Sequence, residues 1–310
     1  MTTHFIPDIH GRVEKLEHAL SRLGFKHLKG AWRHPLGDRV VFLGDFIDRG
    51  PNAGDVIRIA RDMMEAGTGR SIMGNHELNA IHYHTDDAES GDGLRPRSQK
   101  NTHQHAAFLD EFPLRSAGAA EALEWMSELP LAIEEEDFRA VHACWDAAAL
   151  SRLKSLSPSL RLSPDLLKLA AQDDHQVMLD VERVTKGPEI ALPAGYVTHD
   201  KEGTARTRVR SKWWDNQAKY WADASLSVFD PSELPDGEVP RNLGVPHYPE
   251  TEKPVFFGHY WLQGEPHLQA TNALCLDYSA GLDGPLVTYR HEAGAPLSVS
   301  RMIVHDCAYA

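Results

Sequence analysis

The sequence predicts an α/β fold, and three observations support this prediction. Apolar, strand-like runs alternate with amphipathic, helix-like runs through the first third of the 310-residue chain. Polar side chains follow each of these apolar runs directly. Two later runs, in "FRAVHACW" and "PVFFGHYW", repeat the order of an apolar strand followed by a histidine. A sheet of parallel neighbouring strands accounts for all three observations.

The first third has the pattern strand, helix, strand, helix, strand. The apolar run at residues 4–7 predicts the first strand, and apolar side chains at three- and four-residue steps then predict a helix that ends before Gly24. A β-branched run at 39–43 predicts the second strand. A second apolar helical face extends from about 52 to 66, and residues 70–73 predict the third strand. This order implies parallel strands joined by right-handed crossovers.

Composition narrows the function classes. The chain is 42% hydrophobic and 25% charged, which is typical of a soluble globular protein. It has no apolar run near the roughly 18 residues of a membrane helix and no signal-peptide pattern, so we expect a cytoplasmic protein without membrane contacts. A net charge of −13 opposes general nucleic-acid binding. The three cysteines form no CxxC pair, which argues against a disulfide framework or a thiolate zinc site.

Polar groups follow the predicted strands in "DIHG", "GDFIDRG" and "GNHE". Because the carboxyl ends of strands in an open α/β sheet meet at one crevice, we expect these side chains to converge. The converging residues are Asp8, His10, Asp45, Asp48, Arg49, Asn75 and His76, with His142 and His259 added by the two later strands.

These residue types predict a metal site. Carboxylate, amide and imidazole ligands suit manganese, iron, zinc or cobalt better than copper(I), and the imidazoles oppose an all-oxygen calcium site. The candidates are too many for one ion, and one carboxylate can bridge two ions about 3.5 to 4 Å apart. Two divalent ions, two aspartates and a bridging hydroxide leave a charge of about +1, which with Arg49 would attract an anionic substrate.

The ordered motifs "DIHG … GDFIDRG … GNHE … VHA … GHY", over residues 8–259, resemble the calcineurin-like metallophosphoesterase family. The likeness is to its phosphoprotein-phosphatase-like branch, with bacterial Ser/Thr phosphatases and diadenosine tetraphosphatases. The resemblance implies one domain over 1–310, built as a sandwich of two mixed β-sheets flanked by helices. It also implies two divalent ions, with manganese as the first choice and iron, zinc or cobalt as alternatives. The implied ligands are Asp8, His10 and Asp45 for one ion, and Asp45, Asn75, His142 and His259 for the other.

Chemistry then suggests roles for the remaining residues in the motifs. A hydroxide that bridges the ions would attack phosphorus in line. Arg49 would hold phosphate oxygens with its planar fork, His76 would protonate the leaving oxygen, and Asp48 would orient that imidazole. The structural alternatives are an ion pair between Asp48 and Arg49 and a core hydrogen bond for His76.

The substrate class stays open. We expect hydrolysis of phosphate monoesters, of a phosphoprotein or a small molecule, and the alternative is a symmetrical dinucleoside polyphosphate such as diadenosine tetraphosphate. The stretch "ALCLDYSAGLDGPLVTYR" resembles the closing hairpin of the diadenosine tetraphosphatases. Tyr260 and Trp261 replace the second histidine of the G-H-x-H motif, which points away from nucleases. A non-catalytic metal-binding scaffold is the remaining alternative.

Between His142 and His259 lie 116 residues outside the motifs, and we interpret 147–250 as an inserted cap. Leucine spacing near its start predicts helices, and "YVTHDKEGTARTRVRSKWW" predicts a hairpin around "DKEG". Three arginines alternate onto one face of the second predicted strand: Arg206, Arg208 and Arg210. They are either the solvated charges of an edge strand or a site that recognises a second phosphate or a nucleobase.

Two H-x-H pairs lie in a polar stretch after the third motif: His82 with His84, and His103 with His105. They could bind an additional metal, but the polar composition favours a loop beside the active site.

Overall fold

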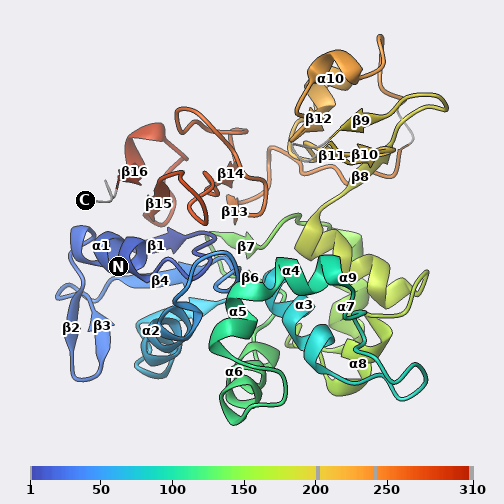
Figure 1. The fold of residues 1–310 in the computed structure, drawn as a ribbon. Helices are drawn as coiled ribbons and strands as arrows, with labels where there is room; N and C mark the ends of the chain where they lie inside the picture. The colour runs from blue at the N-terminus through green and yellow to red at the C-terminus, as the bar shows by residue number, and fades with distance from the viewer. Residues whose placement is uncertain (1, 200–202, 241–242, 307–310) are drawn as a thin grey trace.

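The computed structural model describes residues 2–199, 203–240 and 243–306 (Figure 1). Two mixed sheets form its centre. The strands of the first are β1 (Thr3–Ile6), β4 (Arg39–Phe42), β5 (Gly69–Ser71), β15 (Leu286–His291) and β16 (Met302–His305), in the order β16-β15-β1-β4-β5. The strands of the second are β6 (Ala132–Glu134), β7 (Arg139–Val141), β13 (Val255–Phe257) and β14 (Ala273–Cys275), in the order β14-β13-β7-β6.

The predicted β-α-β-α-β unit is confirmed. Strands β1, β4 and β5 are parallel neighbours, and α1 (Val13–Arg22) and α2 (Ala53–Glu65) lie between them in the chain. In the second sheet β13 is parallel to both β7 and β14, while β6 runs antiparallel to β7. The sandwich of two mixed sheets implied by the resemblance is therefore the observed fold.

The strands are apolar on both faces because each face is covered. In β4, Val41 belongs to the core between the sheets, whereas Phe42 packs with the helices α1 and α2 on the other side. Successive side chains of a strand point to opposite faces, which explains why the sequence is continuously apolar here. Between the sheets, the ring of Phe5 stacks on Phe256 with centroids 3.7 Å apart.

A helical region connects the two sheets. Its members are α3 (Asn75–His84), α4 (Gln99–Gln104), α5 (Ala106–Glu111) and α6 (Ala117–Ser127). After β7 the chain continues through α7 (Ala147–Leu156), α8 (Pro164–Leu169) and α9 (Gln176–Lys186), which confirms the helices predicted from leucine spacing. Leu150, Leu153 and Leu167 are buried in the main core.

The segment between α9 and β13 forms a small lobe that stands at the upper right of Figure 1. It contains the sheet β12-β11-β8, the pair β9-β10, the short helix α10 and its own apolar core around Val209 and Trp221. The bounds are β8 (Glu189–Ala191), β9 (Thr198–His199), β10 (Ala205–Arg206), β11 (Arg208–Ser211), α10 (Trp221–Ala224), β12 (Ser225–Leu226) and the 3₁₀ turn η1 (Pro231–Glu233). Elsewhere, β2 (Lys26–Leu28) pairs with β3 (Ala31–Arg33), and the 3₁₀ turn η2 (Val299–Arg301) precedes β16.

The predicted hairpin is present, but its second strand is divided. β9 and β10 pair on either side of "DKEG", of which residues 200–202 lie outside the described residues. The prediction that three arginines share one strand face is wrong, because Arg206 lies in the pair β9-β10 whereas Arg208 and Arg210 lie in the three-stranded sheet. The carbonyl of Thr207, between the two ladders, accepts a hydrogen bond from Leu192.

Two further sequence features have a structural counterpart. Cys144 and Cys275 are buried free thiols, and Cys307 lies outside the described residues. In the described part of the chain, none of the helices combines the length and the apolar character that crossing a membrane requires.

Candidate metal centre

The structure brings together nine residues predicted from the motifs. They come from the loops that follow β1, β4, β7 and β13 and from the first turn of α3: Asp8, His10, Asp45, Asp48, Arg49, Asn75, His76, His142 and His259. Glycines allow these loops to approach one another closely. A Cβ on Gly258 would lie 2.0 Å from Asp8 Oδ2, and one on Gly74 would lie 2.2 Å from Asp45 Oδ1.

Asp45 occupies the middle of the centre. Its carboxylate belongs to two groups of side chains whose ligand atoms lie within 4.8 Å of one another. One group joins Asp45 to His10 and His76, and the other joins it to His142 and His259. A carboxylate shared between two such groups is placed to bridge two ions. Asp8 lies beside these groups and accepts a hydrogen bond from the backbone N–H of His259 at 3.0 Å.

The histidines of the centre expose nitrogen atoms suited to a metal. His10 donates from Nδ1 to the carbonyl of Ile47 at 2.8 Å, and its buried Nε2 finds no hydrogen-bond partner among the described residues. His142 likewise donates from Nδ1 to Leu43 at 2.7 Å, which leaves Nε2 facing Asn75 Oδ1 at 3.1 Å. Carbonyls that fix one ring nitrogen and free the other are typical of metal-binding histidines.

Burial and charge set the pKa values of these groups. Burial is the main cause that lowers the pKa of His10 to about 3 and the pKa of His259 well below its ordinary value, which keeps both imidazoles neutral. For His142, burial is the largest single cause and lowers the pKa, but the charge and hydrogen bond of Asp45, the charge of Asp8 and the hydrogen bond to Leu43 together outweigh it and raise the pKa to about 10. A metal ion would replace the proton on such a residue.

The carboxylates are crowded. Burial first, and then the charge of Asp277, raise the pKa of Asp8, and burial also raises the pKa of Asp277 itself. Buried acids this close repel one another unless a cation offsets their charge. The free histidine nitrogens, the shared carboxylate and the excess of buried negative charge therefore fit divalent ions.

Glu77 supports the loop that carries Asp45. Its Oε2 accepts the backbone N–H groups of Asp45 at 2.8 Å and Gly74 at 2.9 Å, and its Oε1 accepts the N–H of Phe46 at 2.8 Å. The side chain is fully buried, and burial raises its pKa to about 7. One carboxylate thus ties the turn after β4 to the start of α3.

His76 is held by Asp48. Its Nδ1 donates to Asp48 Oδ2 at 2.5 Å, and its Nε2 lies 3.9 Å from Asp45 Oδ2, toward the ligand groups. His105, from the turn between α4 and α5, donates to the other Asp48 oxygen at 2.8 Å. Burial raises the pKa of Asp48, but the hydrogen bonds and charges of the two histidines together outweigh it and hold the pKa below its ordinary value. The core hydrogen bond considered for His76 is thus not to a carbonyl but to this carboxylate.

Arg49 makes no structural ion pair within the described residues. Its guanidinium lies over the ring of Trp261, 3.9 Å from the ring centroid, a cation–π arrangement. Asp277 accepts the backbone N–H of Trp261 at 2.7 Å and so positions that ring. The pairing with Asp48 considered from the sequence does not form, because Asp48 is engaged by two histidines.

The three arginines of the lobe differ in their surroundings. Arg210 is half-buried, and its charge is the second cause, after burial, that lowers the pKa of His259. Arg208 is exposed and turns to Glu189 of the neighbouring strand, donating to its carbonyl at 2.9 Å. Arg206 is exposed on β10. Of the three, Arg210 is thus the one whose charge acts on the centre.

Several residues of the site were missed by sequence reasoning. Asp277 follows the apolar strand β14, so the same rule of polar groups after strands could have found it. Glu77 stands inside the "GNHE" motif, but the motif letters do not reveal that its carboxylate accepts backbone N–H groups of the neighbouring loops. His105 belongs to an H-x-H pair, yet the four histidines of those pairs do not gather into a metal-binding group in the part of the chain that is described. The segment that carries His105 does lie beside the centre, as predicted.

Comparison with known proteins agrees with this geometry. The model of the calcineurin-like phosphoesterases matches residues 1–158, half of the chain. The chain belongs to the calcineurin-like phosphoesterase family. This phosphoesterase is accordingly a metal-dependent hydrolase rather than a non-catalytic scaffold.

Two symmetrical tetraphosphatases match most of the phosphoesterase, and an asymmetrical one matches about a quarter of it. A symmetrical bis(5'-nucleosyl)-tetraphosphatase of Vibrio cholerae is 25% identical over 303 residues, 94% of this chain and 96% of its own. One from Dechloromonas aromatica is 26% identical over 291 residues, 89% of each chain. An asymmetrical bis(5'-nucleosyl)-tetraphosphatase of Halalkalibacterium halodurans is 36% identical over 76 residues, 24% of this chain and 31% of its own.

Solved structures share the fold. The cold-active protein-tyrosine phosphatase of a Shewanella species has a TM-score of 0.51 and 17% identity, over 98% of this chain and 80% of its own. Another structure of a cold-active protein tyrosine phosphatase has a TM-score of 0.52 at 17% identity, over 93% of this chain and 73% of its own. At these identities the likeness concerns the fold alone.

Proposed function

We propose that the centre holds two divalent ions and hydrolyses phosphate esters. In this proposal one ion is held by Asp8, His10 and Asp45, and the other by Asp45, Asn75, His142 and His259. The place of Asp45 in both ligand groups is the observation that carries the proposal. Bound divalent ions would supply Lewis acidity to the attacking water and to the phosphoryl oxygens. Manganese is the first ion to test, because the ligands are hard oxygens and imidazoles.

His76 is the proposed proton donor to the leaving oxygen. Because Nδ1 is bound to Asp48, the transferable proton is on Nε2, which lies 3.9 Å from Asp45 Oδ2, and we assign this atom to proton donation rather than to metal binding. Asp48 orients the ring, and His105 in turn fixes Asp48. A carboxylate that fixes the tautomer of an imidazole is a recurrent device in acid catalysis.

Two arginines are proposed to hold the phosphate. Arg49 offers a guanidinium without an ion-pair partner among the described residues, and Arg210 projects its charge onto His259 from the lobe. A planar guanidinium group can donate two parallel hydrogen bonds to two oxygens of one phosphate. Arg206 and Arg208 are exposed, and Arg208 is bound to Glu189, so we assign neither a direct phosphate contact.

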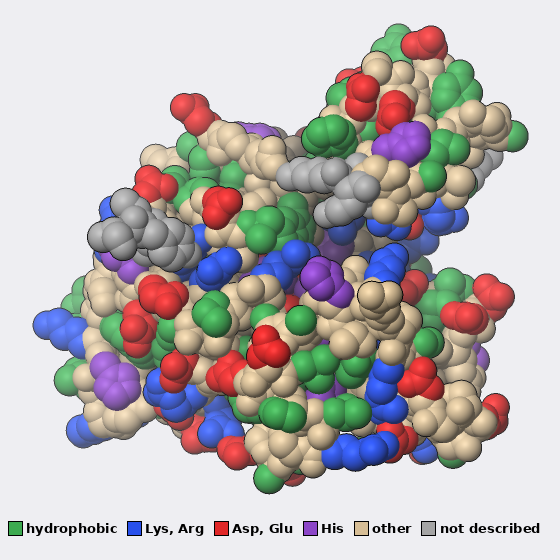
Figure 2. Space-filling view, in the orientation of Figure 1, with side chains coloured by type: hydrophobic (Ala, Val, Ile, Leu, Met, Phe, Trp, Pro, Cys, Tyr) green, Lys and Arg blue, Asp and Glu red, His purple; other side chains and the backbone are tan. Residues whose placement is uncertain are grey.

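Residues 147–250 are proposed to act as a cap within a single domain that covers 1–310. The support is that α7, α8 and α9 pack into the main core, while the lobe that follows carries Arg210 toward the centre. Figure 2 shows Lys, Arg and His side chains gathered along the hollow between this lobe and the body. The cytoplasmic location inferred from the sequence stays a prediction.

Two substrate classes are proposed. The first is phosphate monoesters, either small molecules or phosphoproteins, because the proposed reaction requires only one phosphoryl group at the centre. The second is a symmetrical dinucleoside tetraphosphate, and it is favoured by relatives of that name that match over nearly the whole chain. Cleavage at the central anhydride of such a substrate yields two nucleoside diphosphates.

A substrate screen tests the proposal. The purified protein, loaded with Mn²⁺, is given p-nitrophenyl phosphate, a phosphopeptide and diadenosine tetraphosphate, and the products are separated by chromatography. We expect hydrolysis of at least one substrate, and its loss on treatment with a chelator. Absence of turnover on all three, or turnover that survives removal of the metal, would contradict the proposed function.

A further inference from the structure

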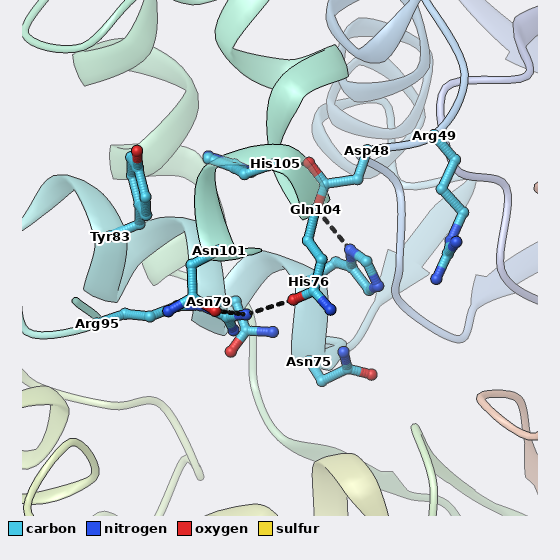
Figure 3. A pocket seen from close by; sticks show the side chains of 10 residues that line it. All are labelled: Asp48, Arg49, Asn75, His76, Asn79, Tyr83, Arg95, Asn101, Gln104 and His105. Carbon is cyan, nitrogen blue, oxygen red and sulfur yellow. Dashed lines mark hydrogen bonds and ion pairs between the residues drawn. The ribbon is translucent and has the colours of Figure 1, made fainter. Parts of the chain in front are cut away.

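A polar pocket lies directly beside His76. It has a volume of about 160 Å³, enough for several waters or one small polar group. Its lining consists of Asp48, Arg49, Asn75, His76, Asn79, Tyr83, Arg95, Asn101, Gln104 and His105 (Figure 3). In this view Arg95 and Arg49 approach from opposite sides, with His76 between them.

The pocket has two walls from different parts of the chain. One wall is α3, where Asn75, Asn79 and Tyr83 recur every four residues and so share one face of the helix. The other wall is the segment from Arg95 to His105. Several hydrogen bonds hold the walls together, among them Tyr83 with Thr102 at 2.9 Å and the backbone N–H of Arg95 with the carbonyl of His82 at 3.0 Å.

Arg95 is fixed in place by neutral groups. Its Nη2 donates to Asn101 Oδ1 at 3.0 Å and to Gln104 Oε1 at 2.9 Å. Among the described residues, this half-buried guanidinium forms no ion pair, and the carboxylate whose charge acts on it is Asp48. Amide oxygens orient the fork without neutralising it, so its charge is available to a ligand.

The charge of the pocket favours an anion. It contains two guanidinium groups and a single carboxylate, Asp48, whose two oxygens are taken by His76 and His105. The side-chain amide of Asn79 adds a neutral donor, for which the described residues offer no hydrogen-bond partner. A planar cation with amide donors around it is suited to phosphate oxygens.

We propose that this pocket binds a second phosphate group of the substrate, the one that leaves when a phosphoanhydride is cleaved. The proposal rests on the proposed function, in which His76 faces the leaving oxygen. The water oxygen bonds to the attacked phosphorus and gives one proton to solvent, and the bridging P–O bond breaks. The leaving phosphate takes a proton from His76 Nε2, and Arg95 holds its remaining negative charge. A phosphate monoester has no group to place beside Arg95.

The test compares an anhydride with a monoester in an Arg95→Gln variant. Wild-type and variant proteins, loaded with Mn²⁺, are assayed on diadenosine tetraphosphate and on p-nitrophenyl phosphate. We expect kcat/KM to fall about 10- to 100-fold on the tetraphosphate, as for loss of a charge-assisted hydrogen bond, and several times less on the monoester. Lys100→Gln is the matched control, since it removes one positive charge from exposed α4 outside the pocket, and it should leave both activities unchanged.

A second readout does not depend on anhydride hydrolysis. ADP and AMP, which differ by one phosphate, are compared as competitive inhibitors of p-nitrophenyl phosphate hydrolysis. Wild type should bind ADP at least about tenfold more tightly than AMP, and Arg95→Gln should lose this preference.

The outcomes separate the pocket from the function. Equal losses on the two substrates, an unchanged preference for ADP, or a wild type that cleaves the monoester but not the tetraphosphate would overturn the second-phosphate site and leave the phosphoesterase proposal intact. If the wild-type protein cleaves neither substrate, both the second-phosphate site and the proposed function are contradicted.

Discussion

Residues at the candidate centre adopt a backbone conformation that side chains normally avoid. Five residues of the centre other than glycine have a positive φ, between 49° and 74°: His10, Asp45, Asp48, Arg49 and His259. Such a conformation costs roughly 1 to 3 kcal/mol at each position, and it persists only where surrounding contacts enforce it. The sequence identified these residues by their chemistry but not by their strain, because nothing in the motif letters reveals φ. Glu77, which accepts three of the neighbouring N–H groups, is one such contact.

Replacing Glu77 by Gln tests this support. Glutamine has one acceptor oxygen where three N–H groups need acceptors, and its NH₂ group would face an N–H donor. We expect a loss of roughly 2 to 4 kcal/mol in the free energy of unfolding, and weaker Mn²⁺ binding in calorimetric titration. Wild-type stability together with wild-type metal affinity would show that Glu77 does not position Asp45.

Replacing His76 by Asn tests the proton donor. We expect kcat to fall roughly 100- to 1,000-fold on alkyl phosphates, while the metal content stays unchanged. The loss should be smaller on p-nitrophenyl phosphate, because nitrophenolate leaves with little need of a proton. The control is His103→Asn, an exposed histidine on α4 outside the pocket. Equal losses on both kinds of ester would point to a role other than proton donation.

At the scale of elements, the sequence predicted those helices and strands that a local pattern of apolar residues determines. The expected helix at 52–66 is α2, Ala53–Glu65, and the expected strand at 39–43 is β4, Arg39–Phe42, because both have a clear apolar period. The six-residue helix α4 was predicted only as a loop. It has no buried residue, and it depends on a cap by Ser98 and on contacts with α3. Short helices of this kind form through tertiary packing, which periodicity does not record.

The division of the lobe into two small sheets could not be predicted either. Alternation alone placed three arginines on one face, but long-range pairing with β8 and β12 decides where each side chain points. That pairing leaves Arg208 beside Glu189 and brings the charge of Arg210 to bear on His259.

The two arginines of β11 therefore form a matched pair for mutation. Arg210→Ala should lower kcat/KM roughly 10- to 100-fold on every phosphate substrate, because it removes a guanidinium beside the centre. Arg208→Ala, two positions away on the same strand, should change kcat/KM less than about threefold, as expected for an exposed ion pair. A larger effect at Arg208 than at Arg210 would show that Arg208 is the arginine that contacts the phosphate.

At the scale of the whole molecule, an acidic chain encloses a cationic hollow. The net charge is −13, yet Lys, Arg and His side chains gather between the lobe and the body (Figure 2). The sequence predicted that such a chain needs a local positive centre for an anionic substrate. It did not predict the pocket beside His76, because its walls come from α3 and from the segment that ends at His105.

Buried histidines outside the centre make folding sensitive to acid. His82 is buried, pairs its Nε2 with the carbonyl of Leu167 at 2.9 Å, and has its pKa lowered to about 4, mainly by burial. In the unfolded chain a histidine takes up its proton near pH 6.5. Between pH 6.5 and 4 the unfolded state therefore binds more protons, and the free energy of unfolding falls as the pH falls.

His82→Gln should reduce that pH dependence. The variant lacks the group that titrates, so its stability should fall less than that of wild type between pH 7 and 4.5, by about 2 kcal/mol. Urea unfolding at both pH values measures the difference, with His103→Gln as an exposed control. Parallel pH dependence in wild type and His82→Gln would show that another group governs acid unfolding.

The central claim is that Asp45 bridges two ions, and metal stoichiometry tests it most directly. The measurement is the elemental analysis of the Mn²⁺-loaded, desalted protein, for wild type and for Asp45→Asn. We predict two ions per wild-type chain, and a lower content in the variant because Asp45 belongs to both ligand groups. A wild-type content of one ion or none, or an undiminished content in Asp45→Asn, would contradict the account.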